Sequence, residues 1–282
     1  TEHWQQTKQQ VAQYDLIRVV RECDLVPEVI LEFYQYFKQT QRSVTFYSQG
    51  VNQSIQGVDK CNAIINCHLA TGKIGEIGCG PFSITGQPNA MGGREVGGLS
   101  NMLAAHMNIE DPLHRDWVQS FWQSPTLCQE PGLKAVDMFN AIKQGKIKAV
   151  WIMATNPLVS MPNRNEIIEA LEQCELVVVS DCVTDNDTLS FAHVKLPATT
   201  WGEKNGTVTN SERRISRQRP VMSTPGETRH DWQIMCDVAK EMGFGAAFDY
   251  QHPSEIFAEH AKLSGLNNGK NGHPKRDFDI SG

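Results

Sequence analysis

Apolar residues along this chain recur either at helical spacing or in short uninterrupted runs. Residues 3–23 carry helical signals that are interrupted near Tyr14 and Asp15. Pro27 then stands where the first turn of a helix tolerates proline. The residues after Pro27 predict a helix with one apolar face. That face comprises Val29, Ile30, Phe33, Tyr34 and Phe37.

Short β-branched and apolar runs alternate with the helical segments. The run SVTFYSQG predicts a strand that ends in a turn, and a helix over roughly 55–70 should follow. In the second half, Gly145 stops a helical stripe, and the buried strand KAVWIMATNP then breaks at Pro157. A helix over 163–174 and the strands LVVVSD and HVKLPATT complete the pattern. The stripe comprises Leu133, Val136, Phe139 and Ile142, and the later helix faces inward with Ile167, Ile168 and Leu171.

Strands that alternate with helices in this way predict βαβ units and a parallel sheet. The uniformly apolar run LVVV supports this, because parallel strands are buried on both faces. Connections in such units are right-handed, so we expect every strand to point the same way. The sequence therefore predicts an α/β fold, a parallel sheet flanked by helices, in two lobes, 1–130 and 131–265, with a polar tail over 266–282.

The residues that follow the predicted strands are polar, and none is positively charged. Ligands of parallel α/β proteins gather beyond the carboxyl ends of the strands. These residues suit hydrogen bonds to ribose hydroxyls, base edges or a fused polar ring. The sequence has no Walker A loop and no G-x-G-x-x-G fingerprint, which argues against an ordinary ATP or NAD site. The strand ends are 48–53, 155–157, 180–181 and 198–200.

Composition and charge narrow the class of partner. The chain has 282 residues, enough for one large core or two small ones, and its 40% hydrophobic content is ordinary for a globular protein. A formal net charge of −6 argues against a protein that binds nucleic acid by general electrostatics. No apolar run approaches the roughly 20 residues that a membrane span needs. We expect neither nucleic acid nor a membrane as partner.

Eight cysteines occur without any C-x-x-C pair. Several of them lie in apolar or helical stretches, where a buried free thiol is normal. A chain of this length needs no disulfide staples, so we expect free thiols in a reducing, cytoplasmic setting. Without clustered cysteines the chain cannot by itself ligate an iron–sulfur cluster or a structural zinc.

A long glycine-rich loop over 72–93 is predicted to run into the segment TGQPNAMGGREVGG, residues 85–98. Long loops in compact domains are usually functional or disordered, and apolar anchors such as Met91 argue against disorder. We expect this backbone to approach something large and flat, and Arg94 to meet a negative group. The alternative is that Arg94 pairs at the surface with Glu95 or another carboxylate.

Six ordered motifs, which together cover nearly the whole chain, resemble the molybdopterin oxidoreductases of the dimethyl sulfoxide reductase family. Within that family they are most similar to assimilatory nitrate reductases. The resemblance implies Rossmann-like sheets in the central domains of such an enzyme, with the tail leading to a domain outside this chain. The motifs are YSQGVNQ, TGKIGEIGCGPFSITGQPNAMGGREVGG, MATNP, VVVSD, LPATTWGEKNGTVTNSERR and HDWQ.

The cofactor implied by the resemblance is molybdenum held by two molybdopterin guanine dinucleotides. An iron–sulfur cluster is implied for the parent protein but not for this segment. Gln49 and Gln53 would lie near the pterin and metal, and Arg94 would lie at the substrate funnel, in the loop 72–98. One guanosine would be held by Asn156, Ser180, Asp181, Lys204 and Asp231.

The activity implied by the resemblance is the reduction of nitrate to nitrite by oxygen-atom transfer, for nitrate assimilation in the cytoplasm. Arg94 would bind nitrate with its planar guanidinium. Partners would be an electron donor, namely a flavoprotein subunit, ferredoxin or flavodoxin, and the remaining domains of the parent chain. The isolated chain would be inactive. Two alternatives are a formate dehydrogenase alpha subunit of the same family and a cofactor-free structural or docking domain.

Each implied site residue also has a purely structural interpretation. Asn156 could form a turn before Pro157, and Ser180 with Asp181 could begin a helix. Lys204 lies in the turn-like EKNG, and Asp231 could close a capping box with Thr228. Gln49 and Gln53 could satisfy backbone groups at a helix start. A basic cluster could support the cofactor phosphates or pair with a neighbouring domain; it comprises Arg213, Arg214, Arg217 and Arg219.

Overall fold

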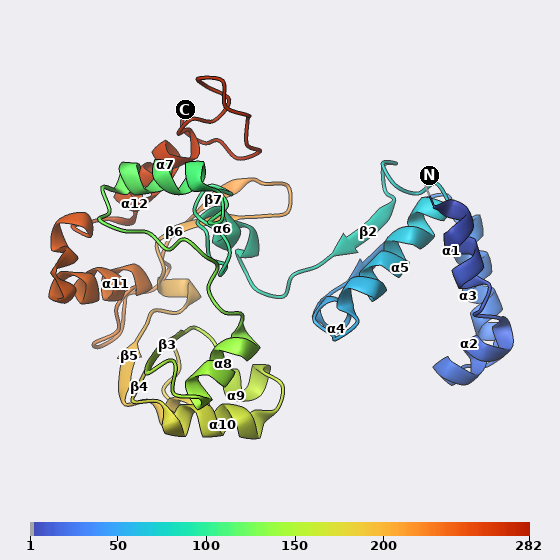
Figure 1. The fold of residues 1–282 in the computed structure, drawn as a ribbon, viewed down its shortest axis with the longest axis horizontal. Helices are drawn as coiled ribbons and strands as arrows, with labels where there is room; N and C mark the ends of the chain where they lie inside the picture. The colour runs from blue at the N-terminus through green and yellow to red at the C-terminus, as the bar shows by residue number, and fades with distance from the viewer. Residues whose placement is uncertain (1–2) are drawn as a thin grey trace. The chain divides into compact units, whose positions relative to one another are not determined.

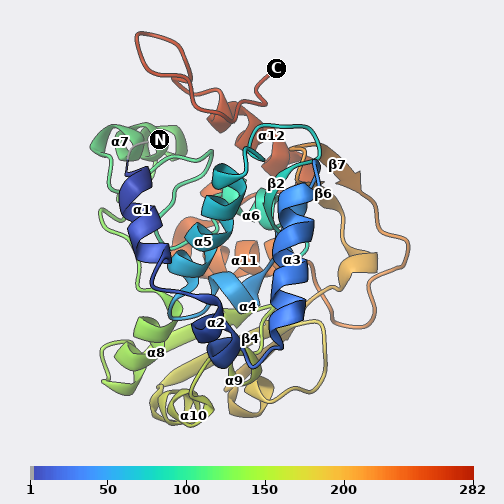
Figure 2. The same ribbon diagram turned by 90° about the vertical axis from the view of Figure 1, so that its right-hand side faces the viewer.

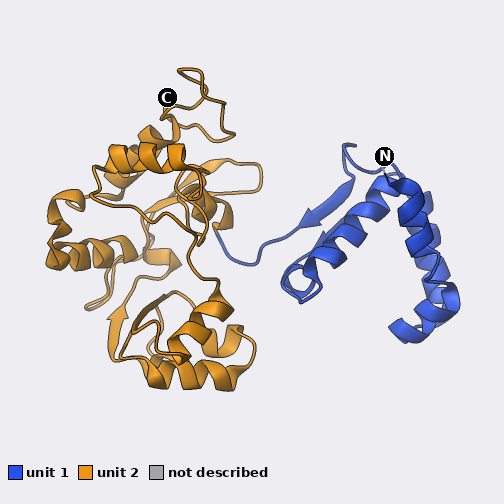
Figure 3. Cartoon of the chain, viewed as in Figure 1, with its two compact units in different colours: residues 1–88 blue, residues 89–282 orange. Residues whose placement is uncertain are grey.

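The computed structural model describes residues 3–282 and divides the chain into two compact units. Unit 1 comprises Thr1–Pro88 and unit 2 comprises Asn89–Gly282, coloured separately in Figure 3. This division differs from the predicted boundary between 130 and 131. The predicted lobes concern the architecture of a longer protein, and they stay a prediction.

Unit 1 begins with the interrupted helical segment that the sequence predicts. The interruption lies at Asp15, whose carboxylate caps the second helix by accepting a hydrogen bond from the backbone N–H of Arg18 at 2.8 Å. The helix after Pro27 and the strand SVTFYSQG are confirmed as well. The elements are α1 (Trp4–Val11), α2 (Leu16–Cys23), α3 (Pro27–Gln39), β1 (Val44–Tyr47), α4 (Gln49–Asn52), α5 (Gly57–Ala70) and β2 (Gly80–Ser83).

Two buried basic side chains tie the helices of unit 1 to its sheet. His68 of α5 is fully buried, its Nε2 lies 2.8 Å from the hydroxyl of Thr45 in β1, and its ring meets Phe37 of α3 edge to face. Lys73 is also buried; its ammonium donates to the carbonyl of Phe37 and lies 4.4 Å from the centre of that ring. The predicted loop over 72–93 is therefore wrong in part, because Lys73 docks its start and 80–83 form a strand parallel to β1.

Unit 2 contains a parallel sheet in the order β3–β4–β5, as the βαβ pattern predicts. Figures 1 and 2 show α8, α9 and α10 gathered around this sheet. Its helices are α6 (Ala90–Glu95), α7 (Pro112–Trp122), α8 (Ala135–Lys143), α9 (Pro157–Ser160), α10 (Arg164–Gln173), α11 (Asp231–Ala239) and α12 (Pro253–Ser264), with short turns η1 (Thr188–Phe191), η2 (Trp201–Glu203), η3 (Lys240–Phe244) and η4 (Gly245–Ala247). Its strands are β3 (Ala149–Met153), β4 (Leu176–Asp181), β5 (Val194–Pro197), β6 (Gly206–Thr209) and β7 (Ile215–Gln218).

Apolar residues of the strands pack against α8 and α10 to form the core of the sheet. Gly145, in the left-handed region with φ +69°, follows α8 as predicted. The predicted stripe is only half correct, because Leu133 lies before the helix and Val136 is exposed. The buried residues include Phe139, Ile142, Val150, Ile152, Ile167, Leu171, Val177 and Val179.

The prediction that all strands run parallel is wrong for β6 and β7, which form an antiparallel pair. Only residues 210–214 connect them, and a parallel connection needs a crossover of about a dozen residues or more. The β6–β7 pair belongs to a second part of unit 2. The core of this second part is formed by residues of the 103–109 loop, α7, α12 and the tail 266–282. That core includes Leu103, Ala105, Met107, Val118, Leu263 and Phe278.

Within residues 3–282, none of the helices combines the length and the apolar character that crossing a membrane requires.

Leu171→Ala should destabilise unit 2 by about 2–5 kcal/mol, because the leucine is 1% exposed and its removal leaves a cavity. Leu133→Ala, at a site that is 53% exposed, should change the free energy of unfolding by less than about 0.5 kcal/mol. Urea unfolding of both variants measures the difference. Equal effects would show that Leu171 does not belong to the core.

Unit 1 should lose stability in mild acid because of His68. Burial, and then the nearby Lys73 ammonium, lower the pKa of His68 in the folded chain. The unfolded chain therefore binds the proton first, so stability is retained above about pH 6.5 and falls as the pH decreases towards the folded pKa.

The measurement is amide hydrogen exchange of α5 as a function of pH, corrected for the intrinsic exchange rate. His68→Gln should remove the acid-dependent increase in α5 opening, whereas His3→Gln, at an exposed histidine, should keep it. An unchanged pH dependence in His68→Gln would contradict the assignment to His68.

Candidate functional site

The carboxyl ends of β3, β4 and β5 meet at one edge of the sheet (Figure 1). The backbone N–H of Ala154 donates to the carbonyl of Ser180, and that of Ala198 donates to the carbonyl of Asp181, both at 2.9 Å. The backbone at Arg229 extends this edge, because its carbonyl accepts from the N–H of Thr199 at 3.0 Å. The sheet thus aligns four polar segments from distant parts of the chain: 155–157, 180–182, 198–200 and 229–231.

The end of β3 turns sharply before Asn156. Ala154 has φ +53°, a left-handed conformation that costs a non-glycine residue free energy and occurs often at functional sites. The side-chain oxygen of Asn156 accepts from the hydroxyl of the buried Thr188 at 2.6 Å. Asn156 does precede α9, as the turn interpretation requires, but its side chain does not cap that helix. Its amide is instead fixed at the edge by Thr188.

The end of β4 presents one buried and one accessible side chain. Ser180 is fully buried, and its hydroxyl accepts from the indole N–H of Trp151 at 2.7 Å. The carboxylate of Asp181 accepts from the backbone N–H of Cys182 at 2.7 Å and from the amide of Asn186 at 2.9 Å. Neither Ser180 nor Asp181 caps a helix, so that structural alternative is wrong. Sequence reasoning missed Asn186, for which no local pattern gave a signal.

An ion pair lies beyond the end of β5. Glu203 folds back to accept from the backbone N–H of Thr200 at 2.9 Å, a local turn that ends at Lys204. The ammonium of Lys204 lies 2.5 Å from the carboxylate of Asp231, and both side chains are partly exposed. Asp231 is the first residue of α11, where its negative charge is favourable.

The predicted capping box between Thr228 and Asp231 is not observed. The residue that precedes α11 is His230, whose backbone N–H donates to the side chain of Gln233 at 3.2 Å. The box is therefore shifted by two residues, which leaves the carboxylate of Asp231 free to pair with Lys204.

Gln49 and Gln53 lie in unit 1, at the carboxyl end of β1. The side-chain amide of Gln49, in α4, donates to the side-chain oxygen of Gln87 at 2.8 Å. The hydroxyl of Ser48 donates to the carbonyl of Ile84, so the TGQP segment lies beside the end of β1. Unit 1 thus forms its own polar strand end, with glutamine side chains as donors and acceptors.

Arg94 lies on the short helix α6 rather than in an irregular loop, which corrects the sequence expectation. Its side chain is exposed, and within residues 3–282 it has no hydrogen bond or ion pair. The alternative that Arg94 pairs with Glu95 is not observed. Glu95 is 4% exposed and accepts a hydrogen bond from the hydroxyl of Thr209 at 2.8 Å. The guanidinium of Arg94 is therefore available to a ligand.

Several glycines around Arg94 are required by the packing of the chain itself. A Cβ on Gly92 would lie 2.2 Å from the side-chain oxygen of Asn89, and one on Gly97 would lie 2.7 Å from the backbone of Leu103. Within residues 3–282, Gly93 has no atom within 4 Å of its would-be Cβ, so open space lies beside the helix at that position. The glycine-rich composition thus has a structural cause within the chain, and the close approach to a ligand stays a prediction.

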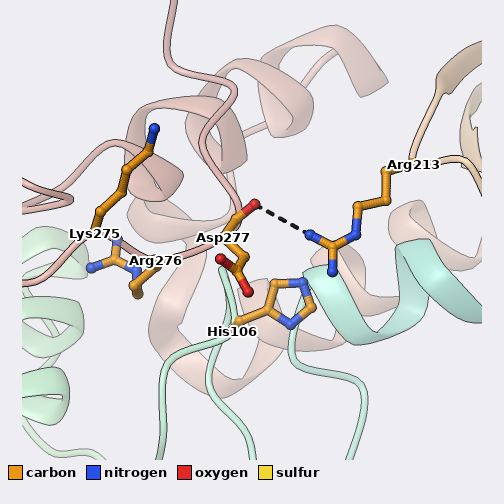
Figure 4. A pocket seen from close by; sticks show the side chains of 5 residues that line it. All are labelled: His106, Arg213, Lys275, Arg276 and Asp277. Carbon is orange, nitrogen blue, oxygen red and sulfur yellow. Dashed lines mark hydrogen bonds between the residues drawn. The ribbon is translucent and has the colours of Figure 1, made fainter. Parts of the chain in front are cut away.

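A cavity of about 300 Å³ lies on another side of unit 2 (Figure 4). Arg213, in the turn between β6 and β7 with φ +61°, donates to the carbonyl of Asp277 at 3.4 Å. Arg276 bonds two backbone carbonyls, whereas its Nε and Nη1 are buried without a partner. Its desolvation lowers the pKa of its guanidinium. The lining has three cationic side chains and one carboxylate, so its net positive charge favours the binding of an anion. The lining residues are His106, Arg213, Lys275, Arg276 and Asp277.

Comparison with known proteins identifies relatives over most of the chain. The family model for molybdopterin oxidoreductase matches residues 23–241. A nitrate reductase of Klebsiella oxytoca is 57% identical over 270 residues, which are 95% of this chain and 30% of that protein. The F420-dependent formate dehydrogenase subunit alpha of Methanocaldococcus jannaschii is 32% identical over 94% of the chain and 38% of its own length. The chain thus spans about a third of the curated relatives that it matches.

The fold agrees with these sequence comparisons. The structure of acetylene hydratase from Pelobacter acetylenicus superimposes with a TM-score of 0.61 and covers 93% of this chain and 38% of that one. At 16% sequence identity this similarity concerns the fold alone. The predicted α/β architecture of a molybdopterin oxidoreductase is confirmed.

Proposed function

Because this chain belongs to the molybdopterin oxidoreductase family, we propose that it is part of the catalytic subunit of a molybdenum-dependent nitrate reductase. The observation that carries the proposal is the 57% identity to a nitrate reductase over 95% of the chain. The whole protein would reduce nitrate to nitrite by oxygen-atom transfer, in nitrate assimilation. Since the chain spans 30% of that relative, the activity belongs to the longer protein.

The edge of the β3–β5 sheet fits the guanosine end of a molybdopterin guanine dinucleotide. Asp181 and Asp231 offer carboxylate oxygens to the N–H groups of guanine and to ribose hydroxyls, and Lys204 offers a donor to the base oxygen. Asn156 is oriented by Thr188 for further hydrogen bonds. Lys204 and Asp231 neutralise one another, so a nucleotide would replace one partly exposed ion pair with several contacts. Ser180 is fully buried, so it would support the edge from within, through its bonds to Trp151 and to the backbone of Ala154.

The metal itself would be held by groups other than these. Within residues 3–282 no three His, Cys, Asp or Glu side chains gather into a metal site. When bound, the molybdenum cofactor supplies the two-electron chemistry that removes one oxygen from nitrate, while this chain binds and orients. In unit 1, Gln49 and Gln53 would contact the pterin with their side-chain amides.

Arg94 would bind the substrate. Its guanidinium is permanently charged and planar, and it offers paired N–H donors that match a planar oxyanion such as nitrate. As charge shifts on nitrate during oxygen transfer, a fixed cation stabilises the transition state more than the ground state. The exposed, unpaired side chain on a short helix is the observation that supports this role.

The setting and the partners follow from the same proposal. All eight cysteines are free, which agrees with a reducing cytoplasm. Electrons would come from a flavoprotein subunit, ferredoxin or flavodoxin, through an iron–sulfur cluster in the parent protein. The remaining domains of that protein would complete the cofactor cradle.

A formate dehydrogenase alpha subunit is the second candidate, because a relative with that name is 32% identical over 94% of the chain. This identity is lower than the 57% to the nitrate reductase, which favours nitrate over formate as the substrate. A cofactor-free docking domain is the third candidate, and it predicts that no nucleotide is retained at the β3–β5 edge.

Arg94→Ala in the whole protein should reduce kcat/KM for nitrate by about 10²–10³-fold, with reduced viologen as donor and with unchanged molybdenum content. Arg94→Lys should recover only part of this loss, because it keeps the charge but not the planar fork. The matched control is Arg21→Ala, at an exposed arginine of α2.

Full nitrate activity in Arg94→Ala would remove Arg94 from the substrate site. Formate oxidation by the wild-type protein without nitrate reduction would assign the function to the second candidate.

Lys204→Ala should reduce the guanosine nucleotide recovered from the denatured whole protein, because each lost charged hydrogen bond weakens binding by about 1.5–3 kcal/mol. The control uses the opposite end of the same sheet. There Lys148, just before β3, pairs with Glu175 at 3.0 Å, and Lys148→Ala should leave the nucleotide content unchanged. Equal nucleotide content in both variants would contradict the placement of guanosine at the carboxyl edge.

A further inference from the structure

The helix that carries Arg94 cannot be stable by itself. α6 has the sequence AMGGRE, six residues of which two are glycine, the poorest helix former after proline. Helices this short do not persist in water without tertiary contacts. The position of the Arg94 side chain therefore depends on whatever holds α6 to the rest of unit 2.

One residue of β6 holds both ends of α6. At the start of the helix, the side-chain oxygen of Asn89 accepts from the backbone N–H of Thr209 at 2.8 Å. At its end, the carboxylate of Glu95 accepts from the hydroxyl of the same Thr209, also at 2.8 Å. Figure 1 shows α6 beside β6. Thr209 thus bridges the residue before the helix and the residue after Arg94.

Burial and close packing restrict both hydrogen bonds of this bridge to Thr209. Thr209 and Glu95 are 6% and 4% exposed. If the Thr209 hydroxyl were removed, the buried carboxylate of Glu95 would lose the hydrogen bond that this hydroxyl donates. Gly92 is needed at the start, because any Cβ there would collide with the side chain of Asn89. The backbone carbonyl of Glu95 is also occupied, since it accepts from the N–H of Ala105 at 2.7 Å.

We propose that Thr209 is a positioning residue for Arg94, acting through Asn89 and Glu95 to fix α6 against β6. This inference rests on the proposed function, in which Arg94 binds the substrate. In that role the guanidinium of Arg94 must be held in a fixed position beside the cofactor. A displacement of such a group by about 1 Å can lower the reaction rate by up to about 100-fold. The hydroxyl of Thr209 would then affect turnover without touching the substrate.

The test uses the whole cofactor-loaded protein and three threonine variants. Thr209→Val keeps the shape and the backbone N–H but removes the hydroxyl, and it should lower kcat/KM for nitrate by about 10–100-fold. Thr209→Ser should restore most of this loss. Thr207→Val is the matched control two residues earlier in β6, where the hydroxyl has no hydrogen bond within residues 3–282, and its activity should equal wild type.

Two further measurements separate positioning from general damage. Amide hydrogen exchange of α6 should rise in Thr209→Val, while that of α10 and the molybdenum content stay unchanged. In the Arg94→Ala background, Thr209→Val should have no additional effect on kcat/KM, because the two residues act as one unit. Wild-type kinetics in Thr209→Val, or an equal loss in both backgrounds, would overturn the proposal.

The failure of the proposed function has a different signature. If Arg94→Ala retains full nitrate activity, Arg94 is not a substrate residue, and Thr209 has no positioning role in catalysis. Faster exchange of α6 in Thr209→Val would then report only a structural bridge.

Discussion

The parallel hydrogen bonding of β3, β4 and β5 is the constraint on which the candidate cofactor site depends. Each strand delivers its next residues to the same edge, so that Asn156, Asp181 and the Lys204–Asp231 pair all lie at or beyond strand ends there, although the sequence separates them widely. The buried runs of valine and isoleucine hold the strands in register against α8 and α10. The polar edge is thus a consequence of how the apolar core packs.

Periodicity and strand-end chemistry predicted much of this arrangement because both are local properties. The break at Asp15, the stop at Gly145 and the parallel sheet follow from a few neighbouring residues each. The Glu95–Thr209 bond did not, since it depends on where the chain returns in space, whereas the β6–β7 pair and the bond of Asn186 to Asp181 are local contacts that lay outside the predicted elements. Glu95 and Thr209 are 114 residues apart in the sequence. Their pairing leaves no local pattern.

The position of Arg94 depends on both its local sequence and contacts with distant residues. Its segment has the composition of a loop, yet tertiary hydrogen bonds fold it into a helix. Gly92 and Gly97 serve close contacts within the chain, while the space beside Gly93 stays open. The same segment therefore supplies a rigid support and an accessible guanidinium, the two properties that recognition of a small oxyanion requires.

An experimental structure of the whole protein with its cofactor bound would test most directly where the guanosine lies. We expect a guanosine at the carboxyl edge of β3–β5, with its base or ribose within hydrogen-bond distance of Asp181 and of the Lys204–Asp231 pair. A guanosine bound elsewhere, with this edge covered by protein, would contradict the assignment of the β3–β5 edge as the guanosine site.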